Sequence, residues 1–249
     1  MSISILVTND DGVHSEGLHF LANFLKKLGK VCIVAPDKEK SAASHSLTLI
    51  HPLRVVKISK NVFSVDGTPT DCVIYAVRGL LKNKRPDLVV AGINKGANLG
   101  DDITYSGTVS AAMEGALLGI PSVSFSMVGR KDYCFDAAED IVVNICSKVL
   151  KNGLPKDTLL NVNIPNLPKE QLGGIMITRQ GKRIYRDTIV KKQDPRGNNY
   201  YWIGGEEPIF EQNKNTDFYA IQKNMVSVTP LHLDLTDEDA LKVLKKWKL

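Results

Sequence analysis

The feature that most constrains the fold is a short apolar segment that ends in two adjacent aspartates. Residues 3–7 are apolar except for Ser4, which is typical of a buried strand in a parallel sheet. Asp10 and Asp11 follow it, and Gly12 permits a sharp change of direction. Two carboxylates this close repel each other, so the pair predicts a bound divalent cation or a shared proton. A solvated turn is the alternative interpretation, because Asn and Asp are common in turns.

The composition indicates a chain with a substantial hydrophobic core. Its 249 residues are 43% hydrophobic, enough for one large α/β domain or one domain with an appendage. The net charge of +5 is too small for a protein dedicated to duplex nucleic acid and suggests only a modest attraction for small anions. Its four cysteines form no Cys-x-x-Cys pair, so we expect reduced core thiols. With no signal-like N-terminus and no apolar run of membrane-spanning length, we expect a cytoplasmic protein without membrane association.

Strand and helix signals alternate through the first 149 residues. Apolar runs at 3–7, 31–35, 87–91 and 121–125 indicate strands, and helical patterns cover 18–28, 68–81, a segment from 106 and 136–149. Residues 136–139 resemble a capping box. Residues 47–58 and 62–65 are expected to be irregular strands or an edge hairpin. The alternation predicts an α/β fold with a doubly wound, mostly parallel, Rossmann-like sheet.

The pattern changes near residue 159. Strand-like segments at 159–164, 175–178, 200–203 and 226–231 follow one another without a helix between each, and an amphipathic helix is expected at 236–248. We therefore predict an α/β core over residues 1–158 and a C-terminal β-rich oligomerisation extension with a closing helix over residues 159–249, packed as one unit with the core. Aromatic residues at 200–202 are typical of an interface, so we expect the extension to form a homo-oligomer.

Polar residues follow three of the expected strands at one edge of the sheet. Asp10 and Asp11 come after the first strand, Ser41 after the second, and Asn94 and Asn98 after the third. Ligands of doubly wound sheets bind in the crevice outside these strand ends. Ser41 and Asn94 taken singly are more often capping residues. Their joint placement favours a shared site.

The donor atoms in this set indicate a hard metal ion. Carboxylate, hydroxyl and amide oxygens suit Mg²⁺ or Mn²⁺, and no histidine cluster favours zinc. The helix expected from Ser106 would turn its first N–H groups toward the same side, where they can hold a phosphate.

Other phosphate-binding motifs do not fit. The segment from Gly92 lacks the Gly-Lys-Ser/Thr ending of a P-loop and the Gly-x-Gly-x-x-Gly pattern of dinucleotide-binding proteins. A signalling receiver domain also has an acidic pair after its first strand. It needs an acceptor aspartate after its third strand, where this chain has Gly92, Ile93 and Asn94.

Several longer motifs are spread along nearly the whole chain. They are Thr-Asn-Asp-Asp-Gly at 8–12, Gly-Thr-Pro-Thr-Asp-Cys at 67–72, Gly-Ile-Asn-Lys-Gly-Ala-Asn-Leu-Gly at 92–100, Tyr-Ser-Gly-Thr at 105–108, Asn-Val-Asn-Ile-Pro at 161–165 and Gln-Asp-Pro-Arg-Gly at 193–197. Together they resemble the SurE family of stationary-phase survival nucleotidases. The resemblance implies a metal-dependent phosphatase acting on nucleoside monophosphates, with some members also trimming polyphosphate. It also implies a homodimer or homotetramer in which the extension reaches a neighbouring subunit.

The resemblance places the family's four metal-binding positions on Asp10, Asp11, Ser41 and Asn94. We therefore expect a 5′-nucleotidase with one divalent ion per subunit, Mg²⁺ or Mn²⁺, in which Asp10 and Asp11 are catalytic. The expected phosphate-binding residues are Asn9, Asn98, Ser106, Gly107 and Thr108. Attack by water is the first hypothesis, and an aspartyl-phosphate on Asp10 is the second. The alternative function is a non-catalytic, metal-dependent nucleotide-binding or signalling module.

Overall fold

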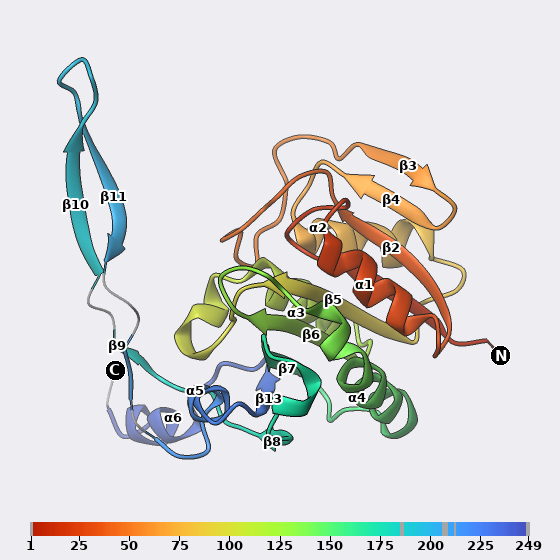
Figure 1. Ribbon diagram of the computed structural model, residues 1–249. Helices are drawn as coiled ribbons and strands as arrows, with labels where there is room; N and C mark the ends of the chain where they lie inside the picture. Colours follow the sequence, from red (N-terminus) through yellow and green to blue (C-terminus); the bar gives the residue numbers. More distant parts are fainter. Residues whose placement is uncertain (1, 185–186, 206–208, 212, 248–249) are drawn as a thin grey trace.

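A nine-stranded, mostly parallel sheet forms the centre of the computed structural model, which describes residues 2–184, 187–205, 209–211 and 213–247 (Figure 1). The strand order is β3-β4-β2-β1-β5-β6-β7-β13-β8. The bounds are β1 (Ser4–Thr8), β2 (Lys30–Pro36), β3 (Val55–Ser59), β4 (Val62–Val65), β5 (Leu88–Lys95), β6 (Ser122–Val128), β7 (Thr158–Pro165), β8 (Ile175–Ile177) and β13 (Val226–His232). The chain starts in the middle, runs to one edge and returns to build the other half. The predicted doubly wound, Rossmann-like α/β fold is confirmed.

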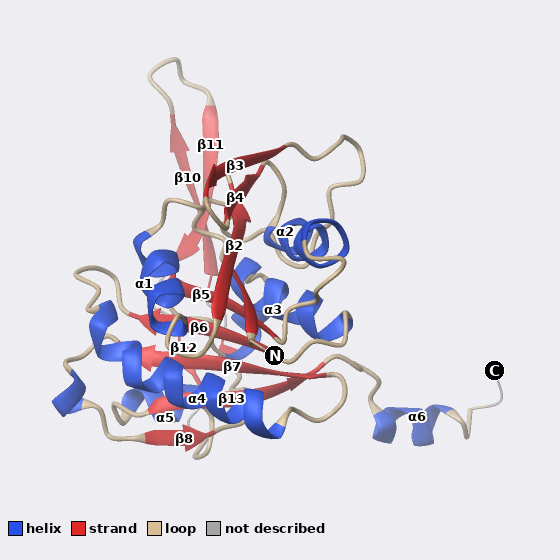
Figure 2. Ribbon diagram, turned by 90° about the vertical axis from the view of Figure 1, so that its right-hand side faces the viewer, coloured by secondary structure: helices blue, strands red, loops and turns tan. Residues whose placement is uncertain are grey.

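Helices cover both faces of the sheet (Figure 2). One face carries α1 (Glu16–Leu25) and α4 (Glu139–Asn152). The other carries α2 (Pro69–Ile74), its π-helical continuation Tyr75–Leu80 and α3 (Gly107–Leu117). Ile5 and Val7 of β1 are buried in the first layer, while Leu6 is buried in the second. This division follows from the alternation of side chains along a strand.

Cap residues start two of these helices at the positions where helices were predicted to begin. The Thr68 hydroxyl accepts the Asp71 N–H at 3.1 Å, and the Asp71 carboxylate accepts the Thr68 N–H at 2.8 Å, which forms a reciprocal capping box. The Ser106 hydroxyl accepts the Val109 N–H at 3.1 Å. The capping box predicted at residues 136–139 is wrong. A 3₁₀ turn there leads into α4, whose N-cap is Ala138, a residue without a side-chain acceptor.

The strand after residue 91 is longer than predicted. The strand was predicted to end at residue 91, but β5 continues to Lys95 and pairs with β6 beyond a register shift between Ala91 and Asn94. The irregularity places Asn94 near the end of the strand rather than in a free loop, because the ladder with β6 resumes there.

The sheet does not stop at residue 158. Strand β7 pairs in parallel with β6, and β13 pairs antiparallel with β7. The sheet thus crosses the boundary that was predicted between the core and the extension. The division into these two parts stays a prediction. The part that projects from the body is the hairpin of β10 (Asp187–Gln193) and β11 (Asn199–Gly205). The sequence had not indicated β9 (Arg183–Ile184), β10, β12 (Ile209–Phe210) or α5 (Asp217–Gln222), and α6 (Glu238–Leu244) is shorter than expected.

One cysteine differs from the expected core thiols. Cys32, Cys72 and Cys146 are buried, but Cys134 is exposed beside the 3₁₀ turn, so the expectation is wrong for Cys134. None of the four forms a disulfide. In the described part of the chain, no helix has both the length and the apolar character needed to span a membrane.

Candidate active site

A polar crevice of about 420 Å³ opens where β1, β2 and β5 end. Six predicted site residues line it: Asp10, Asp11, Ser41, Asn94, Asn98 and Ser106. Five residues that were not predicted as site residues also line it: Glu39, Ala42, Lys95, Asp102 and Tyr105. The strand order reverses between β1 and β5, which is the point where doubly wound sheets bind ligands.

Asp10 is held by the first turn of α3. Its side chain is almost fully buried and accepts a hydrogen bond from the Thr108 hydroxyl. Gly107 permits this approach, since a Cβ there would lie 2.8 Å from the Cβ of Asp10. Burial raises the pKa of Asp10, and the Thr108 hydrogen bond partly opposes the rise. The Thr108 side chain is thus directed to Asp10, and neither Gly107 nor Thr108 is among the residues that line the crevice.

Asp11 carries the strongest sign of a missing partner. Burial, followed by the charge of Asp10, raises the pKa of Asp11 to about 6. Its Oδ2 atom is buried and has no hydrogen-bond partner among the described residues. A buried carboxylate oxygen without a partner is unfavourable, and a cation facing it would remove that penalty.

The neighbouring donors fit a hard divalent ion. The Asn94 side-chain amide donates to the Gly96 carbonyl at 3.0 Å, which leaves its oxygen as a possible ligand atom. The Ser41 hydroxyl donates to Glu39 at 2.6 Å and is otherwise exposed. Within the described ranges, no three His, Cys, Asp or Glu side chains form a metal-binding cluster. Two carboxylates, a hydroxyl and an amide would leave coordination positions for water and phosphate, as Mg²⁺ prefers.

Asn9 is not brought into the crevice lining. It is fully buried, and its amide donates to the Gly12 carbonyl at 3.0 Å and to the Ser15 hydroxyl at 2.6 Å. The side chain therefore fixes the turn after β1. The position of Asn9 gives no support to the prediction that it binds phosphate.

Asn98 is positioned by two buried asparagines of β7. The Asn98 N–H donates to the Asn163 side-chain oxygen at 2.9 Å, and the Asn98 carbonyl accepts the amides of Asn161 at 2.8 Å and Asn163 at 2.9 Å. The Asn98 side chain donates to Ser126 at 2.8 Å. Both β7 asparagines are fully buried. This network fixes the backbone of the crevice loop, because buried polar groups keep their hydrogen bonds.

Replacing Asn163 with alanine is expected to destabilise the protein and loosen Asn98. The change removes the acceptor of the buried Asn98 N–H and one donor to its carbonyl, so we expect a loss of about 1–3 kcal/mol in unfolding free energy. Denaturant melts would measure the loss, and turnover should fall with it. Asn166→Ala is a matched control at the end of the same strand, because its hydrogen bonds go to residues 131, 132 and 134. Equal stability of Asn163→Ala and the unmodified protein would contradict this role.

The crevice loop is also linked to the root of the hairpin. Asp217, buried at the start of α5, accepts the Gly100 N–H at 2.8 Å and the Gly181 N–H at 2.9 Å. Lys182 pairs with Asp101 at 3.3 Å, next to Asp102 of the crevice lining. The position of the extension and the shape of the crevice are therefore connected by hydrogen bonds that no local sequence pattern indicated.

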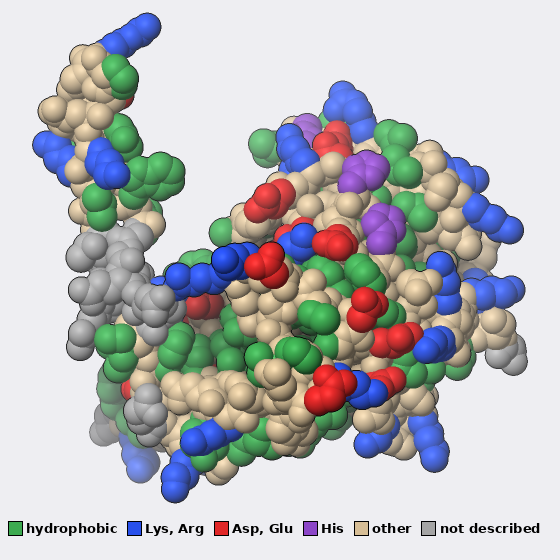
Figure 3. Space-filling model, in the orientation of Figure 1, with side chains coloured by type: hydrophobic (Ala, Val, Ile, Leu, Met, Phe, Trp, Pro, Cys, Tyr) green, Lys and Arg blue, Asp and Glu red, His purple; other side chains and the backbone are tan. Residues whose placement is uncertain are grey.

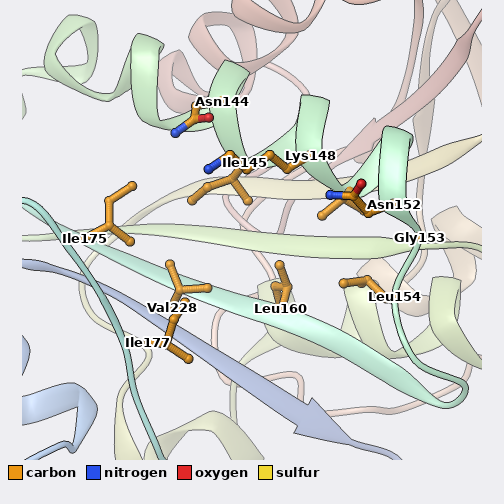
Figure 4. Close-up of a pocket in the computed structure, with 11 residues that line it drawn as sticks. Asn144, Ile145, Lys148, Asn152, Gly153, Leu154, Leu160, Ile175, Ile177 and Val228 are labelled. Atoms are coloured by element: carbon orange, nitrogen blue, oxygen red, sulfur yellow. The ribbon is translucent and has the colours of Figure 1, made fainter.

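A second cavity, of about 260 Å³, lies between α4 and the strands β7, β8 and β13 (Figure 4). Its walls are mainly aliphatic, with Ile145, Leu160 and Val228 facing the space, and its polar side chains are Asn144, Lys148 and Asn152. It has no carboxylate or hydroxyl among its lining residues. It therefore lacks the carboxylates that the predicted metal site requires.

An acidic pair beside a helix N-terminus at the switch point of a doubly wound sheet defines an α/β protein that can hold a phosphorylated ligand against a cation. Comparison with known proteins gives the family. Residues 5–187 match the family model described as survival protein SurE, and the chain belongs to the SurE family.

Relatives match over almost the entire chain. A protein named 5′-nucleotidase SurE from Geobacter sulfurreducens is 54% identical over 99% of this chain and 94% of its own length. The protein of the same name from Aquifex aeolicus is 51% identical over 97% of both chains. The crystal structure of the SurE protein from Aquifex aeolicus superposes with a TM-score of 0.86 at 49% identity and covers 97% of this chain and 98% of that one.

Proposed function

We propose that this protein is a metal-dependent 5′-nucleotidase, a phosphomonoester hydrolase that converts nucleoside monophosphates to nucleoside and phosphate. The observation that carries the proposal is the buried, unpartnered Oδ2 atom of Asp11 in a crevice with Asp10, Ser41 and Asn94. The relatives named 5′-nucleotidase, at more than half identity, support the same reaction and argue against a non-catalytic module.

Asp10, Asp11, Ser41 and Asn94 would hold one divalent ion, Mg²⁺ or Mn²⁺, in each subunit. When bound, such an ion supplies positive charge against the phosphoryl oxygens and makes nearby water more acidic. Four carboxylates line the crevice (Asp10, Asp11, Glu39 and Asp102), and Asp102 is paired with Arg183 at 2.7 Å, which leaves three carboxylates against the cation of Lys95. Without added positive charge, this lining would repel a phosphate dianion.

The chain's own residues would orient the substrate and the water. Thr108 fixes Asp10, and the first amides of α3 with Ser106 would hold phosphate oxygens. One aspartate would orient the attacking water and receive its proton. Direct attack by Asp10 ranks second, since one of its carboxylate oxygens already accepts the Thr108 hydroxyl.

Phosphate release from AMP by purified protein tests the proposal, with short polyphosphate and a chromogenic phosphate ester as further substrates. The Asp11→Asn protein, purified in the same way, controls for contaminating phosphatase. Turnover by the unmodified protein alone supports the nucleotidase. If the unmodified protein and Asp11→Asn both bind the nucleotide, and the unmodified protein releases phosphate no faster than the variant, a binding module is favoured instead.

We also propose that the protein is a homo-oligomer joined through the hairpin of β10 and β11. The hairpin stands away from the body and carries apolar side chains along its length (Figure 3). Tyr201 is 58% exposed, Trp202 is 62% exposed and Ile203 is 84% exposed. A lone two-stranded hairpin is marginal in water, and exposed aromatics are enriched at interfaces.

Replacing Tyr201 and Trp202 with serine is expected to lower the mass of the protein in solution. Light scattering at micromolar concentration would show a dimer or tetramer for the unmodified chain and a smaller species for the double variant. Leu117→Ser, which changes a similarly exposed apolar residue on α3, is the control and should leave the mass unchanged. A monomeric unmodified protein would contradict the proposal.

A further inference from the structure

The crevice needs a surface for the base as well as a site for the phosphate. Its lining is dominated by carboxylate, amide, hydroxyl and ammonium groups, and Tyr105 is the one aromatic side chain among its lining residues. The Tyr105 side chain is 59% exposed, so one part of the ring faces solvent at the rim of a charged cavity. A base cannot stack on the other groups, because stacking requires a flat apolar face.

The backbone of Tyr105 is fixed although its side chain is exposed. Its N–H donates to the Asp102 carbonyl at 3.0 Å, and its carbonyl accepts the Ser44 N–H at 3.1 Å. The Ser44 hydroxyl also donates to the carbonyl of Thr104 at 2.8 Å. The phenol hydroxyl makes no hydrogen bond to any described residue. Hydrogen bonding of the ring therefore does not explain why an aromatic residue occupies this position.

Tyr105 is also the neighbour in the chain of Ser106, a residue proposed to bind the phosphate. It directly precedes Ser106, the N-cap of α3, and both residues line the crevice. A phosphate held beside Ser106 would lie next to Tyr105, which lines the same crevice and is exposed to solvent. Exposed ring area held on a fixed backbone is favourable for stacking, because little conformational freedom is lost on binding.

We propose that the Tyr105 ring is the surface on which the base of a nucleoside monophosphate stacks, which would make it a specificity residue for nucleotides over simpler phosphate esters. The inference rests on the proposed nucleotidase function. It concerns the base and not the reacting phosphate.

The competing location is the apolar cavity lined by Leu99, Val128, Phe210 and Phe218. One of its lining residues, Leu99, directly follows Asn98 of the crevice lining in the chain. The Phe210 and Phe218 rings stack on each other with their centroids 3.4 Å apart and their planes 20° apart, and Phe218 is 4% exposed. Their facing surfaces are already occupied by each other, so a base would have to separate them.

The test compares two substrates that differ only by the base, AMP and ribose 5-phosphate. The measured quantity is the ratio of kcat/KM for AMP to kcat/KM for ribose 5-phosphate, with KM and kcat reported separately. In Tyr105→Ala and Tyr105→Leu this ratio is expected to fall about 5- to 150-fold, through a higher KM for AMP, because base stacking on an aromatic contributes that much. Leucine keeps bulk without a π-face. Tyr105→Phe should restore the ratio to within about twofold, and Phe210→Ala should leave it unchanged.

The outcomes separate this inference from the function on which it rests. If the unmodified protein releases phosphate from neither substrate, the nucleotidase proposal fails. If the unmodified protein acts on both and the ratio is unchanged in Tyr105→Ala and Tyr105→Leu, the function stands and the Tyr105 inference is overturned. A loss equal for both substrates, or a ratio that falls in Phe210→Ala but not in Tyr105→Ala, also overturns it.

Discussion

Asp11→Asn protein is expected to lose turnover by a factor on the order of 10³ while remaining folded. The change removes one of the two carboxylates of the proposed metal site, and losing a single preorganised electrostatic group in an active site costs about 10²–10³ in kcat. Initial rates with AMP under saturating metal would measure it. Asp136→Asn, which changes an exposed carboxylate outside the crevice lining, is the control and should keep the normal rate. A near-normal rate for Asp11→Asn would remove Asp11 from the site.

The same variant should be at least as stable as the unmodified protein when both are metal-free. The pKa of Asp11 is raised to about 6 by burial and by the charge of Asp10, so the folded metal-free state holds the Asp11 proton more tightly than the unfolded state does. The stability of the metal-free protein should therefore fall as the pH rises from about 4 to about 6. Asparagine carries no charge and removes this penalty. At pH 7.5 we expect a higher Tm for metal-free Asp11→Asn, and at pH 4 the difference should shrink.

Removing divalent metal should reduce the activity to background, and adding Mg²⁺ or Mn²⁺ should restore it. The crevice is lined by one lysine and by four carboxylates, of which Asp102 is paired with Arg183, so the remaining negative charge repels a phosphate dianion unless a cation intervenes. Chelator treatment followed by titration with each metal would measure the effect. Undiminished turnover in demonstrably metal-free protein would contradict it.

Metal binding should also be visible without any turnover. An ion that binds the folded state alone stabilises it by about 2.7 kcal/mol at a concentration one hundred times its Kd. Melts of the chelated protein with added Mg²⁺ or Mn²⁺ should show a rising Tm. The rise should be much smaller in Asp11→Asn and unchanged in Asp136→Asn. An equal rise in all three proteins would place the ion elsewhere.

Local patterns determined much of the architecture and the centre of the candidate site. The apolar run before Asp10 and the cap residues Thr68 and Ser106 act through neighbours a few residues away, so the strand and both helix starts could be predicted. The alternation of such elements implies a doubly wound sheet, and its switch point brings Asp10, Asp11, Ser41 and Asn94 to one crevice.

Tertiary structure alone decided which polar side chains are already hydrogen-bonded to other protein groups. Asn9 was predicted from the sequence to be a site residue, yet its side-chain amide donates hydrogen bonds within the turn after β1. The Thr108 hydroxyl likewise donates to Asp10. The partner of a buried side chain can lie more than sixty residues away, as Asn163 does from Asn98, and residue spacing does not encode such a pairing. The same holds for the continuation of the sheet through β7 and β13. Strand pairing at long range is set by which faces and edges remain to be covered once the chain has folded, and that is a property of the whole molecule.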